Sequence, residues 1–246
     1  MCSALRRRSS HKSLLGYLKG PQERRHSLSL IERAQLPTSG GQRVLSLNDI
    51  LGVTDEATGK AILTRKTRLA IAVVLAFSML QLHTGPWLRD DWGKRDIYFL
   101  QDPDGFIHTE QPFLTRHFSP YTAETSGSHR ERSTFRACSS SLLSLGILIL
   151  ELWFNGRIES LPFRRTYQGP DGLDNEYTEF NTAQKWQEQA MEEAGLDLHN
   201  PTRRCIYCAF GSVSQDLEDE ELRRAVYSEV IQPLERLLQR YDVKPQ

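Results

Sequence analysis

Two long runs of apolar residues stand out along the chain, Leu69–Leu82 and Leu142–Phe154. In a helix, the residues of the first run cover two opposite faces: Leu69, Ala72, Val73, Ala76 and Leu80 on one, and Ile71, Leu75, Met79 and Leu82 on the other. A helix that is apolar nearly all round is surrounded by its own protein. The pattern therefore predicts two buried helices, one from Thr64 to about His83 and one over Leu142–Phe154.

Other segments have the polar and apolar faces of surface helices. Ala183–Ala194 is amphipathic and is followed by Gly195, which favours a helix end. A last helix is predicted from near Asp216 to about Tyr241, with a bend or break before Pro233. A short helix is also expected after Ser46, because Ser46 and Asp49 have capping-box spacing.

Strands are predicted where the apolar period changes to two. Residues His26–Ile31 alternate polar and apolar, and with Leu14–Leu18 they predict a β-hairpin over Leu14–Ile31. Ile97–Leu100 predicts a short strand, and Phe106–His108 a second one after the turn at Gln101–Gly105. Two polar stretches predict connections, Ser119–Ser141 as a mobile surface loop and Phe163–Tyr177 as a Gly/Pro/Asp-rich link.

The N-terminus allows a second interpretation. Residues 1–22 hold five basic residues and no acid, which is typical of a mitochondrial transit peptide. The hairpin interpretation instead makes Leu14–Ile31 part of the mature protein and leaves 1–13 as a flexible N-terminus. The compartment is accordingly predicted as cytoplasmic, with mitochondrial as the alternative.

Composition and charge narrow the class of protein. The chain has 246 residues, with 31 basic and 31 acidic side chains, and this balance argues against a dedicated nucleic-acid binder. Four cysteines exclude a disulfide scaffold and fit a reducing compartment. Both apolar runs are shorter than the ~20 residues that cross a bilayer, so no membrane span is expected.

Familiar chemical motifs give little support to an enzyme. Cys205 and Cys208 form a single C-x-x-C with no second ligand pair, so we expect two packed thiols and no metal. The chain contains no H-E-x-x-H, no G-x-S-x-G and no phosphate-binding glycine loop.

One arrangement resembles the middle of a protein kinase. Leu82-His83 ends a buried helix, and a loop then leads to the strand Ile97–Leu100, as in the kinase catalytic loop His-Arg-Asp-x-x-x-x-Asn. Matched by position, Arg89 and Asp90 replace the His and Arg, while Asp91 falls on the catalytic base and Asp96 on the metal-binding Asn. Ser144–Leu152 is similar to the buried central helix of the large lobe.

A closer resemblance is to a fungal kinase-like domain family of unknown function. The segments that carry it are Leu80–Leu88, Asp96–Leu100, Leu145–Leu152, Arg203–Cys208 and Asp219–Glu235. Members often follow a HeLo-type prion-inhibition-and-propagation domain linked to heterokaryon incompatibility. The resemblance implies a mainly α (α+β) fold: a kinase-like C-lobe over 45–242, a β-hairpin remnant of the N-lobe over 14–44, and a tail over 243–246. It also implies that the helical partner domain and the first part of the N-lobe are missing here.

Departures from the kinase pattern decide the expected function. Phosphoryl transfer needs a glycine loop, a strand Lys and the magnesium-binding Asp of Asp-Phe-Gly. None of these is identifiable in the sequence. Near the position where Asp-Phe-Gly is expected, the chain has the basic pair Arg116-His117. We therefore expect a non-catalytic interaction module that binds a protein partner and needs no cofactor or metal. From the resemblance, we expect it to act in fungal incompatibility or innate-immunity-type signalling. The alternative is an atypical kinase or nucleotide-binding enzyme that uses Asp91 as base and Asp96 as metal ligand.

Overall fold

The computed structural model describes residues 14–19, 25–29, 41–54, 59–83, 88, 92–114, 140–211 and 216–241. They are mainly helical with a small β-sheet, which confirms the α+β class. No helix among these residues is long and apolar enough to cross a membrane.

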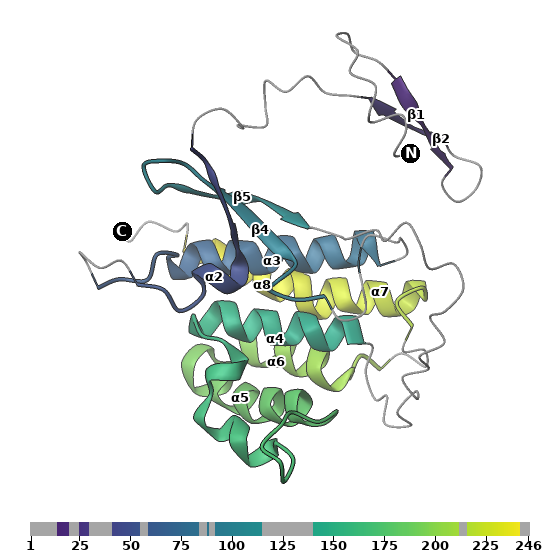
Figure 1. Ribbon diagram of the computed structural model, residues 1–246. Helices are drawn as coiled ribbons and strands as arrows, with labels where there is room; N and C mark the ends of the chain where they lie inside the picture. The colour runs from purple at the N-terminus through teal and green to yellow at the C-terminus, as the bar shows by residue number, and fades with distance from the viewer. Residues whose placement is uncertain are drawn as a thin grey trace. The chain divides into compact units, whose positions relative to one another are not determined.

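The two predicted buried helices form the centre of the larger compact unit. Helix α3 spans Arg65–Leu82 behind the N-cap Thr64, and α4 spans Ser140–Phe154, two residues longer at its start than predicted. The side chains of α4 are buried on all sides, as in Leu145, Leu148 and Leu150. Helix α4 packs against α3 and against two later helices, α5 and α6 (Figure 1). It is therefore the interior element around which this unit is built.

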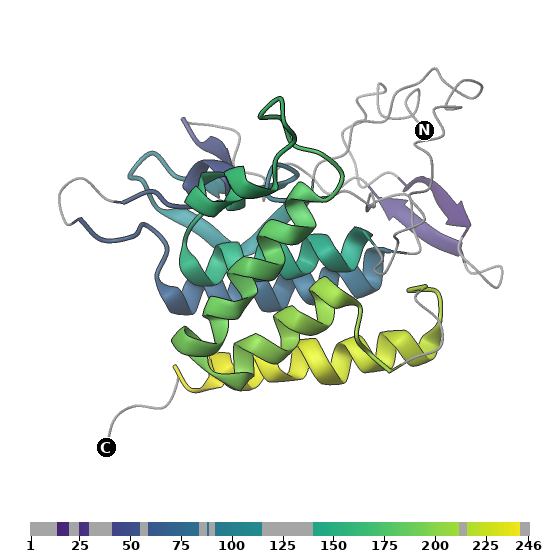
Figure 2. The same cartoon turned by 90° about the horizontal axis from the view of Figure 1, so that it is seen from below.

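Helices α5 and α6 cover α4 on the side away from α3 (Figure 2). Helix α5 spans Thr178–Ala194 and begins five residues before the predicted Ala183. Its first turn can be buried because the Thr178 hydroxyl donates to the Tyr167 carbonyl and the Thr182 hydroxyl to the Thr178 carbonyl. Gly195 ends it with φ +64°, and α6 follows at once over Leu196–Tyr207.

The C-terminal helix is divided into three parts. Helix α7 spans Glu220–Val226, a π-helical turn η5 spans Tyr227–Ile231, and α8 spans Gln232–Gln239. Together they form the yellow rod in Figure 2. A bend or break is predicted before Pro233. The structure has a π-helical turn directly before Gln232-Pro233, through which the helical backbone continues into α8. The N-cap is Asp219, three residues after the predicted start near Asp216.

A three-stranded sheet lies beside α3, in the order β3-β4-β5 (Figure 1). Its strands are β3 (Arg43–Ser46), β4 (Ile97–Gln101) and β5 (Ile107–Leu114), and β4 and β5 are antiparallel. The return strand predicted over Phe106–His108 is thus considerably longer. Between β3 and β4 along the chain lies the short helix α2 (Leu47–Ile50), which has the predicted Ser46/Asp49 capping box.

One predicted connection is partly wrong. Phe163–Tyr177 was expected to be irregular, but the 3₁₀ helix η4 covers Pro162–Tyr167, after a shorter one, η3, over Ile158–Ser160. Proline at the first position of a helix lacks only an N–H that would be unpaired there, so Pro162 begins η4 and does not break it. Positions 115–139, most of the predicted mobile loop, lie outside the described residues, and Ser140 and Ser141 belong to α4.

The chain divides into two compact units, residues 1–43 with 102–105, and residues 44–101 with 106–246. In the first unit, β1 (Leu14–Lys19) and β2 (Arg25–Ser29) pair antiparallel, which confirms the predicted hairpin strands. The predicted turn at Gly20-Pro21 lies outside the described residues.

Candidate functional site

The candidate residue Asp96 closes a short loop that enters β4. Its Oδ2 accepts a hydrogen bond from the Gly93 amide at 3.0 Å, and its own amide donates to the Gly93 carbonyl at 2.9 Å. The carboxylate thus holds the turn in which it lies. Asp91, Arg89 and Asp90 lie outside the described residues, so their predicted positions stay predictions.

The same loop, residues 92–96, is anchored to two helices. The indole Nε1 of Trp92 donates to the Ser141 carbonyl of α4 at 3.3 Å, and Trp92 is 3% exposed. On the other side, the Asn48 amide of α2 donates to the Lys94 carbonyl at 3.1 Å. Buried backbone and indole groups need such partners, so the loop has a fixed place on α4.

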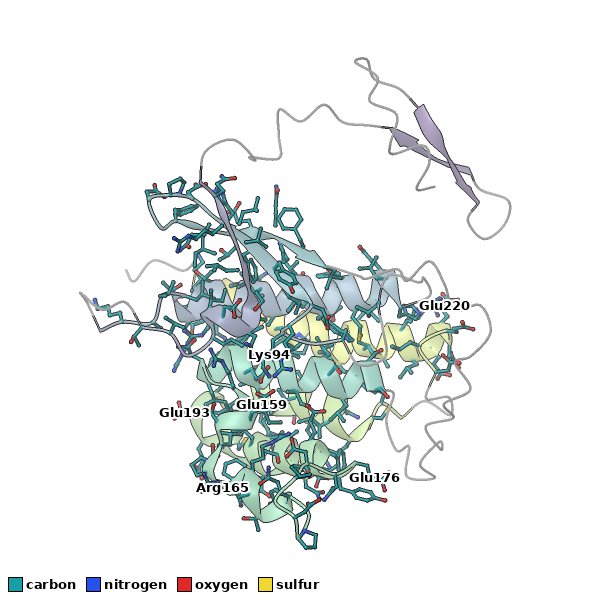
Figure 3. All side chains as sticks on the ribbon, viewed as in Figure 1. Lys94, Glu159, Arg165, Glu176, Glu193 and Glu220 are labelled. Carbon is teal, nitrogen blue, oxygen red and sulfur yellow. The ribbon has the colours of Figure 1, made fainter. Side chains whose placement is uncertain are left out.

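Lys94 extends from this loop into a buried cluster of charges beside α4. Its Nζ lies 2.6 Å from Glu151 Oε1 and 2.9 Å from Glu159 Oε2. The side chain of Glu151 is 1% exposed, and its Oε1 also accepts a hydrogen bond from the Ile158 amide at 2.9 Å. Figure 3 shows Lys94 and Glu159 close together at the centre of the helical unit. One cation therefore joins α4 to η3, the 3₁₀ helix that follows it.

The two carboxylates of this cluster differ in their pKa. Burial raises the pKa of Glu151 above its ordinary value, against the opposing effect of Lys94. Burial also acts to raise the pKa of Glu159, but the hydrogen bond and charge of Lys94 outweigh it and hold this pKa below its ordinary value. The buried acid on α4 thus depends on Lys94 for its charge.

Other candidate residues are placed as follows. Cys205 is buried on α6 and Cys208 is half-buried just beyond it, with φ +50°. Burial strongly raises the pKa of the Cys205 thiol, which keeps it protonated and packed as an apolar group. Among the parts of the chain that the structure describes, no cluster of His, Cys, Asp or Glu side chains is arranged to hold a metal ion.

Sequence reasoning missed Lys94 as a site residue. The available signal was Glu151, an acid inside the apolar run of α4, because a buried carboxylate requires a cation or several donors. The sequence does not say which of its 31 basic side chains supplies the charge, since Lys94 lies 57 positions away.

Comparisons with known proteins complete the description. No curated protein and no solved structure matches the chain. A family model does match, over residues 1–241, and its description is Domain of unknown function (DUF7580). Because the match extends over nearly the whole sequence, the chain belongs to this family.

Proposed function

We propose that the chain is a non-catalytic, kinase-like interaction module that binds a protein partner. The observation that carries this proposal is that the side chains of Trp92, Lys94 and Asp96 are bonded within the protein. They belong to residues 92–96, the part of the kinase-like loop that the structure describes. Lys94 in its middle is 7% exposed and bonded to two carboxylates, and Asp96 holds its own turn. Side chains bonded in this way support a role for the loop in packing.

The order of elements also supports a kinase-like origin. A buried helix, α3, leads through this loop to two antiparallel strands, β4 and β5, and then to the central apolar helix α4. This is the order on which the resemblance to a kinase large lobe was based. The Ser-Leu-Gly segment that begins at Ser144 lies inside the buried helix, where the resemblance expects it.

A role in fungal incompatibility or innate-immunity-type signalling follows from the resemblance alone. Under this proposal the partner is a protein, and the cytoplasm is the compartment in which the two meet. The transit-peptide alternative would move both to the mitochondrion.

Nucleotide binding provides the first test. The purified chain is melted with and without ATP and magnesium, because a ligand that binds only the folded state raises the melting temperature. We expect no shift at millimolar nucleotide. A saturable rise that is lost in Asp96→Asn would instead favour the nucleotide-binding alternative.

Transfer of phosphate provides the second test. Radiolabelled ATP is incubated with the chain, magnesium or manganese, and generic protein substrates, with Asp91→Asn as the matched variant. We expect no incorporation from either protein, since the parts that neutralise the charge of ATP are not identifiable in the sequence. Incorporation by the wild-type chain that disappears in Asp91→Asn would show the proposal to be wrong and the atypical-kinase alternative right.

A further inference from the structure

A cavity of about 490 Å³ lies along η3 and η4, the two 3₁₀ helices that follow α4 in the chain. It is lined by residues of η3, η4 and the turn between and after them: Glu159, Ser160, Leu161, Pro162, Arg164, Arg165 and Gln168. Its size lies within the ~300–1,000 Å³ common for ligand pockets. Apolar side chains and two adjacent arginines share its walls, a combination that suits an anionic group on an apolar stem.

Arg164 is held in a way that leaves part of its guanidinium unpaired. The residue is 6% exposed, and its Nη2 donates to Asp174 Oδ2 at 2.6 Å. Its Nη1 is covered and has no hydrogen-bond partner among the described residues. A buried guanidinium nitrogen without an acceptor is costly, so the positive charge of Arg164 in the wall is only partly matched by hydrogen bonds.

Arg165 is the second cation of the wall and is exposed. In the described part of the chain it has no ion-pair partner, whereas Arg164 has Asp174 and Lys94 has Glu151 and Glu159. In Figure 3 Arg165 is separated from Lys94 and Glu159. Within the described residues, the cavity thus combines the unpaired charge of Arg165 with a buried guanidinium, that of Arg164, in which one nitrogen lacks an acceptor.

The walls are fixed before any ligand arrives. The Ile158 amide is bonded to Glu151 of α4, and the Tyr167 carbonyl at the end of η4 accepts the Thr178 hydroxyl of α5 at 2.8 Å. Gln168 Nε2 donates to Asp174 Oδ1 at 2.9 Å, which holds the carboxylate that pairs with Arg164. Because the backbone of the walls is already fixed, a ligand has to order little more than the exposed side chain of Arg165, which favours binding.

We propose that this cavity binds a carboxylate of an acidic segment in a protein partner, with Arg165 pairing with it directly and Arg164 adding its charge from the wall. A single negative charge fits better than the double charge of a phosphate, because Arg165 is the one lining cation without a counter-charge and Glu159 lies on the same wall. Leu161 and Pro162 provide contacts for the aliphatic stem of a Glu side chain. This inference rests on the proposed function, since it names the chemistry of the partner.

The test is a titration of the full chain with short peptides, observed through the arginine Nε–H signals in NMR spectra. The probes are acetyl-(Gly-Glu)₃-amide, its Gln counterpart with an amidated end, and the Gln peptide with a free C-terminus. We expect saturable binding of the Glu peptide and none of the amidated Gln peptide. Binding of the free-ended Gln peptide would also support the site and would assign the carboxylate to a chain terminus.

Two matched variants decide whether the arginine is responsible. Arg165→Gln should weaken binding of the Glu peptide about tenfold or more, as expected for loss of a charge-assisted hydrogen bond. Arg236→Gln, an exposed arginine of α8 that does not line the cavity, should leave it unchanged.

Several results would overturn the proposal: no binding at millimolar Glu peptide, equal loss in both variants, or tighter binding of a phosphoserine peptide than of the Glu peptide. None of these depends on nucleotide. The proposed function fails separately, through phosphate transfer that requires Asp91, so the two failures are distinguishable.

Discussion

Residues 92–96, which lie against α4, and the wall formed by η4, which packs against α5, both present cations, but they use them differently. Lys94 is buried and bonded to two carboxylates, and the loop around it has its backbone and indole groups paired. Arg165 is exposed without an ion pair in the described residues, and Arg164 has one nitrogen without an acceptor. Lys94 therefore stabilises the fold, whereas the two arginines still have donors available for binding.

This difference separates structural charge from charge available for binding. A buried ion pair contributes little net stability, yet removing one partner is strongly destabilising, because the other is left as an isolated buried charge. An exposed unpaired arginine can be removed at almost no cost to stability. Replacing Lys94 should therefore lower the free energy of unfolding far more than replacing Arg165. Replacing Arg165 should instead have the larger effect on peptide binding.

The largest effect is expected in α4, the helix that carries Glu151, the partner of Lys94. Leu148 is 2% exposed in the middle of this helix. Leu148→Asp should abolish cooperative folding, because an unpaired buried carboxylate costs several kcal/mol against a total stability of about 5–15 kcal/mol. Circular dichroism during thermal melting checks this. The control is Leu196→Asp at the start of α6, where the leucine is 58% exposed and the mutant should melt normally.

The next effect compares the two cations directly. Lys94→Met should lower the free energy of unfolding by about 3–5 kcal/mol, since Glu151 loses its buried counter-charge. Arg165→Gln should change it by less than about 0.5 kcal/mol. Urea denaturation measures both.

A second substitution tests whether this loss of stability comes from the uncompensated charge of Glu151. Adding Glu151→Gln to Lys94→Met should recover most of the lost stability, because the uncompensated charge is gone and an acceptor remains for the Ile158 amide. Equal losses in the single and double variants would mean that Lys94 acts through packing and not through Glu151.

Part of this contrast could be predicted from the sequence and part could not. The two apolar helices and the capping box at Ser46 depend on residues close together in the chain, and the structure confirms them. The pairing of Lys94 with Glu151 depends on tertiary packing, which no local pattern encodes. Helix η4 was missed because Pro162 and the later Gly and Asp residues favour a turn, while the start of a helix tolerates proline equally well.

The close approach of α4 and α6 was also beyond the sequence, and it makes a third prediction. A Cβ added at Gly146 would lie 2.9 Å from Ile206 Cγ1 and 3.0 Å from Cys205 Cβ. Gly to Ala inside a helix is ordinarily stabilising. Here Gly146→Ala should instead lower the free energy of unfolding by about 1–3 kcal/mol through overpacking.

Ser144→Ala is the matched control for that change, because this half-buried residue lies on the same helix and should be close to neutral. Urea midpoints of the two variants check the prediction. A Gly146→Ala protein as stable as wild type would mean that α6 can move away from α4, and the rigid placement of Glu151 would then be in doubt.

The smallest effect concerns α2, which holds the Lys94 loop from the other side through the Asn48 amide. Ser46→Ala removes the hydroxyl that accepts the Asp49 amide at 3.2 Å and donates to Asp49 Oδ2 at 2.7 Å. Loss of an N-cap of this kind should cost about 1 kcal/mol at neutral pH.

The hydrogen bonds from the Ser46 side chain and backbone hold the pKa of Asp49 below its ordinary value of 3.8. A carboxyl whose pKa is lowered by folding contributes stability above its unfolded pKa, and that contribution disappears as the pH falls through the folded value. The difference between wild type and Ser46→Ala should therefore shrink as urea unfolding is repeated from about pH 5 down to about pH 2. Asp49→Asn should show no such change with pH relative to its own Ser46→Ala double variant. A wild-type to Ser46→Ala difference that stays constant over this range would mean that the carboxylate takes no part in the cap, and that α2 is held to the Lys94 loop by the hydroxyl and backbone alone.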